Sequence, residues 1–441
     1  MAPASISIAT VHPDDVRITD PDVDVEVIVN DTSNLRNALN DGALLNGSGA
    51  VSEKSRDTAA DSSGPIHLSV SPETLAQALS RLHTTLASRV ALPILSHVLI
   101  ETTATTLRLT ATDLDTTVCI AIPAEVSRIG RFTLPLKKLL ELSKTLPSEP
   151  VTIVAHPHTG RARLACGRSV FRLYTQPHEE FPLPPSETSV LLGRCSADDL
   201  QTVIMHTAFA ASLDDRRPIL QGILCQFRPR TLRMVATDAY RLACIDRQLS
   251  SESPLIEACD LIVPAAALKQ VYNIFPPDEQ LTMLRTDNHV VFQSATQTVI
   301  SRLIEGPYPA YESIIMSHAD YIVTIDRSIF ADILKRVITI APEKSHCTRL
   351  SFTRHLLTVS IQTPDGGEAR DEMDVPWDAD PLDIGVNTQY LLDILRHLAS
   401  PMIRFKYTAE GRPIIIEPAE WPADMGGLFM LVPMHLDVAT R

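Results

Sequence analysis

The sequence repeats itself at a fixed interval of 125 residues, and this repetition limits the folds that it can adopt. Leu107–Asp113 (LRLTATD) recurs as Leu232–Asp238 (LRMVATD), and Leu92–Leu95 (LPIL) recurs as Arg217–Leu220 (RPIL). A further step of 125 residues reaches Leu357–Ile361 (LTVSI), which alternates like a strand without matching the motif. Repetition at one spacing indicates duplicated structural units. We therefore expect three copies of one domain. The third copy is inferred from its strand pattern alone, because it does not match the motif.

Helix and strand patterns follow the same order in each copy. The helix patterns lie at 72–87, 135–146, 197–209, 264–275, 328–340 and 388–398. The segments between them show the period-two alternation of antiparallel strands. Pro135 and Pro264 suit the first turn of a helix, where a missing N–H costs nothing. These patterns predict an α+β fold of three repeated domains.

Proline-rich segments divide the copies from one another. Phe181–Pro185 and Pro307–Pro309 each follow the last strand pattern of a copy. We expect domains at 66–190, 191–317 and 318–441.

An acidic extension precedes the first copy. Residues 1–65 hold 11 acidic and four basic residues, a net charge of −7. We expect this extension to be mostly disordered, with a short strand at Asp22–Val27 as the alternative.

Composition excludes several classes of protein. A net charge of −14 argues against a basic nucleic-acid binder. The seven cysteines are widely spaced. This spacing favours buried free thiols in a reducing cytoplasm over a disulfide framework or a zinc site. Neither a signal peptide nor an 18-residue apolar run occurs, so we expect no membrane contact.

Motifs for catalysis and cofactor binding are missing. The chain has no Gly-x-Gly-x-x-Gly, Walker, His-Glu-x-x-His or Cys-x-x-Cys pattern, so we expect neither cofactor nor metal. His156 and His158 have no evident third ligand nearby. Asp113 and Asp238 occupy equivalent positions after a strand. A repeated aspartate of this kind is more typical of a turn than of a pair of catalytic acids.

Charge is distributed unevenly between the helices and the rest of the chain. The six helix patterns carry eight basic and six acidic residues, whereas the whole chain carries −14. A weakly basic helix set favours contact with phosphates, and ordinary solvated helix faces remain the alternative.

Seven short motifs, in one order along residues 66–436, resemble the bacterial sliding clamps, the beta subunits of DNA polymerase III. The motifs are Leu92–Leu95 (LPIL), Ala111–Asp115 (ATDLD), Glu180–Pro182 (EFP), Arg217–Gly222 (RPILQG), Ala236–Ala243 (ATDAYRLA), Asn387–Leu392 (NTQYLL) and Val432–Leu436 (VPMHL).

The resemblance implies a ring and a function. Three sliding-clamp domains form an arc with helices on the inner face and antiparallel sheets outside, and two arcs close head to tail as a homodimer. Such a clamp is not an enzyme. It is a processivity factor that encircles duplex DNA without reading its sequence, in the cytoplasm at the nucleoid. DNA polymerase and clamp-loader subunits bind it through short linear motifs.

The resemblance also implies two sets of site residues. The partner-peptide pocket, between the second and third domains, would comprise Leu220, Thr237, Arg241, Leu242, Pro309, Ile314, Met430, Val432 and Pro433. The DNA-facing residues would be Arg89, Arg216 and Arg217 from the resemblance, joined by basic residues of the helix patterns, Lys137, Lys138, Lys335 and Arg336.

Departures from the family pattern concern the pocket more than the fold. Ala239-Tyr240 stands where clamps usually have Gly-His, Val432 where they have Met, and His435 where they have Arg. Residues Asp437–Arg441 extend past the usual end, close to the expected pocket. The alternative functions are a clamp-like scaffold or competitor that is not loaded on DNA, and an unrecognised enzyme.

Overall fold

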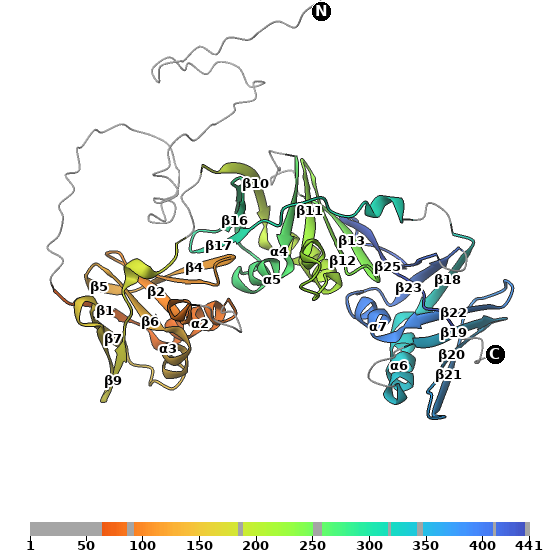
Figure 1. Cartoon of the computed structure of the whole chain (residues 1–441), viewed down its shortest axis with the longest axis horizontal. Coiled ribbons are helices and arrows are strands. Elements are labelled where there is room, and N and C mark those ends of the chain that lie inside the picture. Colours follow the sequence, from red (N-terminus) through yellow and green to blue (C-terminus); the bar gives the residue numbers. More distant parts are fainter. Residues whose placement is uncertain are drawn as a thin grey trace, which may run out of the picture.

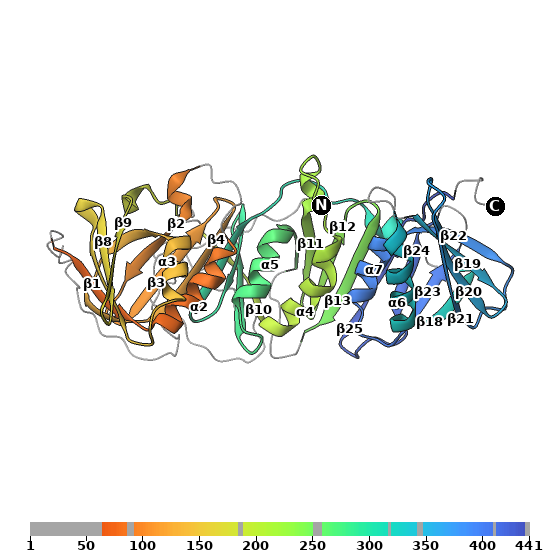
Figure 2. The same ribbon diagram turned by 90° about the horizontal axis from the view of Figure 1, so that it is seen from below.

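The chain forms an open arc with its helices on the concave side (Figure 1). The computed structural model describes residues 64–85, 92–183, 188–249, 258–315, 319–341, 347–408 and 412–436. Within those ranges, six α-helices line the inner side of the arc and the strands form its outer side and its ends. Figure 2, seen from the concave side, shows the helices in front of the strands. This arrangement confirms the predicted α+β fold with helices inside and sheets outside.

Three structural units follow one another along the arc. The first unit contains β1 (Ile66–Val70), α2 (Pro72–His83), β2 (His97–Thr102), β3 (Thr106–Thr112), β4 (Thr116–Pro123), β5 (Glu125–Arg128), β6 (Arg131–Pro135), α3 (Leu136–Ser143), β7 (Val151–His156), β8 (Arg161–Cys166) and β9 (Ser169–Tyr174). The second contains β10 (Val190–Ser196), α4 (Ala197–Thr207), β11 (Gly222–Arg228), β12 (Thr231–Thr237), β13 (Arg241–Gln248), β14 (Cys259–Pro264), α5 (Ala265–Ile274), β15 (Gln280–Arg285), β16 (His289–Gln293) and β17 (Gln297–Arg302). The third contains β18 (Tyr321–Asp326), α6 (Arg327–Val337), β19 (Cys347–Thr353), β20 (Leu356–Gln362), β21 (Glu368–Asp374), β22 (Leu382–Asn387), α7 (Thr388–Arg396), β23 (Met402–Tyr407), β24 (Ile414–Pro418) and β25 (Met425–Leu431).

The helices begin where the sequence places a capping residue. Ser71 and Ser196, 125 residues apart, each accept a hydrogen bond from a backbone N–H in the first turn of α2 and α4. Asp326 does the same for α6. Such caps satisfy donors that have no partner within the helix. Pro135 and Pro264 are wrongly predicted as first-turn residues, because they end β6 and β14 in an extended conformation and occupy the N-cap position.

Each pair of helices buries one apolar face against the sheets. In α2, Leu75, Leu79 and Leu82 are completely buried, at the spacing that places side chains on one side of a helix. The helix packs against α3, whose Leu136 and Leu139 are also completely buried. The opposite faces of both helices therefore stay open to the hollow of the arc.

Strand pairing joins the units into continuous sheets. Strands β17 and β4 pair between the first two units, and their eight-stranded sheet runs β10-β15-β16-β17-β4-β3-β2-β6. Strands β13 and β25 pair between the second and third units, in a sheet that runs β14-β11-β12-β13-β25-β24-β23-β18. A β-carbon on Gly427 would lie 2.1 Å from the carbonyl oxygen of Cys244, so this second joint requires glycine.

Two smaller sheets close the ends of the arc. The first unit ends in the sheet β5-β1-β7-β8-β9, and the third ends in the sheet β21-β20-β19-β22. Strands β9 and β21 are therefore edge strands, and Figure 1 places them at opposite ends of the arc. An unpaired edge presents backbone groups that can pair with another chain.

Candidate partner-binding site and inner surface

An apolar cluster lies on the sheet that joins the second and third units. Its buried members are Leu224, Val235, Leu242, Cys244, Ile262, Tyr311, Ile415 and Met430. Leu242 of β13 and Met430 of β25 are direct cross-strand partners, so the cluster spans the joint between the units. The cluster is separate from the main core, which makes it a candidate surface for an apolar partner.

Two tyrosines from the segment after β17 lie against this cluster. The Tyr308 hydroxyl donates to the Val235 carbonyl oxygen at 3.1 Å, and the Tyr311 hydroxyl donates to Gln226 Oε1 at 2.9 Å. Burial raises the pKa of Tyr311 to about 12, and burial also raises the pKa of Tyr308. Both hydroxyls therefore stay protonated and able to donate at neutral pH.

The residues expected in the pocket occupy different depths. Leu242 and Met430 belong to the buried cluster. Three other expected residues are exposed and lie within three positions of a cluster member in the sequence: Pro309, Ile314 and Val432. The remaining expected residues Leu220 and Thr237 are buried, and Pro433 is half-buried. Arg241 is also largely buried, with 11% of its side chain exposed.

Sequence reasoning missed several members of the cluster. Leu224, Val235 and Ile262 alternate with residues that face the other side of the sheet, so only the sheet order identifies them. From the sequence, we assigned Tyr308 only to the proline-rich segment that marks a domain boundary, and not to the site. The available signal was a tyrosine between two prolines, Pro307 and Pro309, near the end of the second domain.

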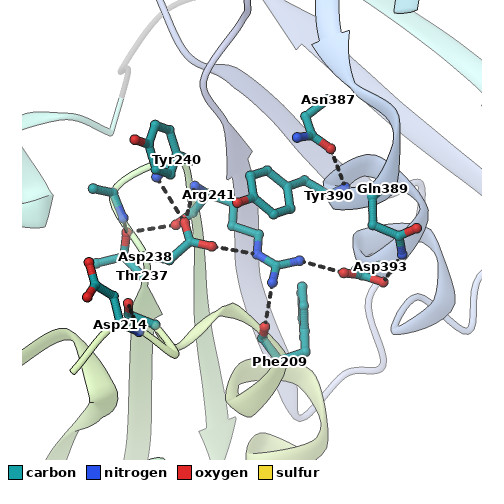
Figure 3. A network of polar contacts seen from close by, with 12 residues as sticks. Phe209, Asp214, Thr237, Asp238, Tyr240, Arg241, Asn387, Gln389, Tyr390 and Asp393 are labelled. Atoms are coloured by element: carbon teal, nitrogen blue, oxygen red, sulfur yellow. Dashed lines mark hydrogen bonds and ion pairs between the residues drawn. The ribbon is translucent and has the colours of Figure 1, made fainter. Parts of the chain in front are cut away.

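Arg241 lies at the centre of a polar network beside the cluster (Figure 3). Its guanidinium donates from Nε to Asp238 at 3.0 Å, from Nη1 to Asp393 at 2.8 Å and from Nη2 to the Phe209 carbonyl oxygen at 2.9 Å. The same group lies 4.5 Å from the centre of the Tyr390 ring. Arg241 thus connects β13 of the second unit to α7 of the third.

Tyr240 extends this network to the surface. Its ring stacks on that of Tyr390 with centroids 6.3 Å apart, and 57% of its surface is exposed. Its carbonyl oxygen accepts from the Val432 N–H at 2.8 Å. The tail Asp437–Arg441 lies outside the described residues. The last described residue, Leu436, lies against Gly385 of β22.

The repeated aspartates Asp113 and Asp238 close tight turns. Asp113 Oδ1 accepts from the N–H groups of Asp115 and Thr116, and Asp238 Oδ1 accepts from those of Tyr240 and Arg241. The structure therefore confirms the interpretation of both as turn residues.

The inner surface carries the expected lysines on α3 and α6. Lys137 and Lys138 are exposed on α3, and none of the ion pairs found among the described residues includes them. On α6, Lys335 is paired with Asp332 at 2.8 Å and Arg336 with Asp371 at 2.6 Å. The positive charge of the lining is therefore more available at the first unit than at the third.

The arginines expected to contact DNA outside the helices have different positions. Arg216 and Arg217 lie in the turn before the short helix Pro218–Gln221, and Arg216 is paired with Asp214 at 2.9 Å. Arg89 lies outside the described residues.

A groove borders edge strand β9 at the end of the first unit. It has a volume of about 530 Å³ and is lined by Lys138, Glu141 and Leu142 of α3 and by residues 170–173 of β9. Val170 is 46% exposed there. Four arginines and no acidic residue occur between Arg161 and Tyr174, whereas β21 holds four acidic residues and one arginine. These two segments at the ends of the arc are therefore opposite in formal charge.

The described part of the chain offers neither a metal site nor a membrane span. Its histidines, cysteines and carboxylates form no group of three that could hold a metal ion. Among the same residues, no helix is long and apolar enough to cross a bilayer.

Comparison with known families matches all three units. The N-terminal, central and C-terminal domain models of the DNA polymerase III beta subunit match residues 66–185, 194–310 and 312–424. The beta sliding clamp of Pseudomonas aeruginosa is 28% identical over 373 residues, which are 84% of this chain and 100% of that protein. The beta sliding clamp of Chlamydia trachomatis is 26% identical over 367 residues, which are 83% of this chain and 86% of that protein.

Solved structures show the same likeness. The sliding clamp of Pseudomonas aeruginosa bound to griselimycin superposes with a TM-score of 0.77 at 27% identity, over 85% of this chain and 100% of that one. The clamp of Caulobacter crescentus gives a TM-score of 0.78 at 27% identity, with the same coverage. The three matched domain models and the structural likeness to solved clamps identify the same family. The chain belongs to the DNA polymerase III beta subunit family and is a sliding clamp, a non-catalytic processivity factor of DNA replication.

Proposed function

We propose that two copies of this clamp close head to tail into a ring around duplex DNA. The observation that carries the proposal is the pair of edge strands β9 and β21, each with one open edge, at opposite ends of the arc. An arc with unlike ends closes without forming a filament when two copies join by a two-fold operation. The arginine-rich end of the first unit would meet the acidic β21 of the partner copy.

The domain limits also remain a proposal. We place the domains at 66–190, 191–317 and 318–441, with the extension at 1–65. The ends of β9 at Tyr174 and of β17 at Arg302, each before the next unit begins, support these limits.

DNA would pass through the ring along the inner helices without sequence recognition. The exposed Lys137 and Lys138 on the inner helices support contact with phosphates. Lys335 and Arg336 would contribute to this contact when they exchange their carboxylate partners for a phosphate. Phosphate contacts fix position but carry no sequence information. The protein would act in the cytoplasm, associated with the nucleoid.

The apolar cluster between the second and third units would bind short linear motifs of DNA polymerase and clamp-loader subunits. We expect motifs with a glutamine and one or two large apolar side chains. Burial of one Leu or Phe side chain contributes about 1.5–3 kcal/mol. Two such anchors, less the ordering cost, correspond to about micromolar affinity, which allows partners to exchange. The scaffold or competitor that is not loaded on DNA is not favoured, because the curated relatives are sliding clamps.

Binding to a labelled linear duplex, which can thread through a closed ring, tests the DNA-facing assignment. We expect two duplexes of unrelated sequence to bind equally, with an affinity that falls as salt rises. Replacing Lys137 by Ala should reduce the slope of log affinity against log salt by about 0.9 for each phosphate that the lysine neutralises. The variant Lys137→Arg keeps the charge and should keep the slope. Preference for one duplex sequence, or an unchanged slope in Lys137→Ala, would contradict the assignment.

A further inference from the structure

We propose that Arg241 is a positioning residue: it holds the second and third units in the register that forms the partner pocket, and does not itself bind the partner peptide. This inference rests on the proposed function of the cluster as a peptide site. The resemblance places Arg241 at the polar edge of the pocket, where a direct contact with the peptide is the simpler expectation. The structure gives its side chain a different role.

The guanidinium of Arg241 is held by contacts within the protein. Each of its three nitrogens donates a hydrogen bond, to Asp238, Asp393 and the Phe209 carbonyl oxygen. Two aromatic rings also lie close to it, Tyr390 with its centre at 4.5 Å and Phe209 with its centre at 5.4 Å. Three of its five N–H donors are thus committed and 11% of the side chain is exposed, so little of the guanidinium is open to a peptide.

The contacts of Arg241 come from both units. Asp238 and Phe209 belong to the second unit, whereas Asp393 and Tyr390 lie on α7 of the third (Figure 3). The carboxylate of Asp393 is itself held, because its Oδ1 accepts from Gln389 Nε2 at 3.0 Å. Arg241 therefore ties the start of β13 to a fixed point on α7.

The position of Arg241 in the sheet carries this restraint into the pocket. Arg241 pairs with Leu431 across the joint, and the next pair is Leu242 with Met430. Leu242 and Met430 are the two members of the apolar cluster that meet across the joint. A shift of the joint at Arg241 would therefore separate the two sides of the pocket at its floor.

The other end of β13 provides a matched comparison. Arg247 also bridges the units, with Asp199 at 2.7 Å and Asp424 of the third unit at 2.8 Å. It lies five positions along the strand from Leu242. If Arg241 acted only through the general stability of the joint, removal of the Arg247–Asp424 pair would have the same effect on the pocket.

The test is the affinity of the full-length clamp for a labelled peptide that carries Gln, Leu and Phe. We expect Asp393→Asn and Arg241→Gln each to weaken peptide binding about five- to tenfold, because the competent pocket is then populated for less of the time. The double variant should bind no more weakly than the weaker single variant, since both substitutions remove one connection. Asp393→Glu, which restores the carboxylate, should recover part of the affinity. Asp424→Asn should bind the peptide as the unchanged protein does.

The outcomes separate the inference from the function on which it depends. If the unchanged clamp does not bind the peptide, the proposed peptide site is wrong. If the unchanged clamp binds and only Arg241→Gln weakens binding, Arg241 contacts the peptide directly and the positioning role is overturned. Equal reductions of affinity in Asp393→Asn and Asp424→Asn would also overturn it, since the effect would then come from the joint as a whole.

Discussion

Val170→Glu is expected to make this clamp a monomer at micromolar concentration, where the proposed ring is a dimer. Val170 lies on edge strand β9 beside the groove at the end of the first unit, and nearly half of its surface is exposed. In the proposed ring this edge meets β21 of the partner, where Glu368, Asp371, Glu372 and Asp374 are concentrated. The substitution adds a carboxylate to an apolar position opposite like charges, which costs several kcal/mol at a buried interface. Sedimentation equilibrium measures the mass directly.

A matched substitution controls for general effects of a new charge. Val190→Glu changes a valine of nearly equal exposure, 47%, on edge strand β10 of the second unit, which is not at a proposed joint. It should leave the protein dimeric. A monomeric unchanged protein, or a dimeric Val170→Glu variant, would show that the ring does not close through β9.

Leu242→Ala is expected to weaken peptide binding about tenfold or more. The side chain is 5% exposed and forms the floor of the apolar cluster together with Met430. Truncation removes the support beneath the surface on which an anchor side chain would pack, and each 1.4 kcal/mol of binding free energy corresponds to a factor of ten in affinity. Fluorescence anisotropy with the labelled peptide gives the affinity.

Leu261→Ala is the control for reduced stability. Leu261 is 8% exposed on β14 of the same sheet but belongs to the main core instead of the cluster. This variant should melt at a lower temperature and still bind the peptide normally. If Leu242→Ala also binds normally, the peptide site lies elsewhere.

The repeat made much of the fold predictable. Ser71 and Ser196 are 125 residues apart, and both cap the first helix of a unit. Asp113 and Asp238 close equivalent turns for the same reason. These features are local, because a cap or a turn depends on residues within a few positions of it.

Features that depend on distant pairing were not predictable from the sequence. Strand patterns do not state that β17 pairs with β4, or β13 with β25, so the continuity of the sheets across units was missed. The partners of Arg241 illustrate the same limit at the site. Asp393 lies 152 residues away, and only the assembled joint between units brings the two together.

The pairing of the α6 cations has a similar origin. Lys335 and Asp332 are three residues apart on one helix, a spacing that the sequence displays. Arg336 pairs instead with Asp371 of β21, 35 residues further along the chain. The available charge of the inner surface therefore depends on the tertiary fold as well as on the count of lysines and arginines.

Retention on circular and linearised DNA tests whether this protein acts as a ring around DNA. The labelled clamp is loaded by a clamp-loader complex onto a nicked circular plasmid, isolated by gel filtration and then treated with a restriction enzyme that cuts once. We expect the clamp to stay with the circle through gel filtration and to dissociate when the plasmid is linearised, because a ring slides off a free end. Equal retention on circular and linear DNA at the same salt concentration would show that the clamp binds the outer surface of the duplex, and would contradict the proposed ring.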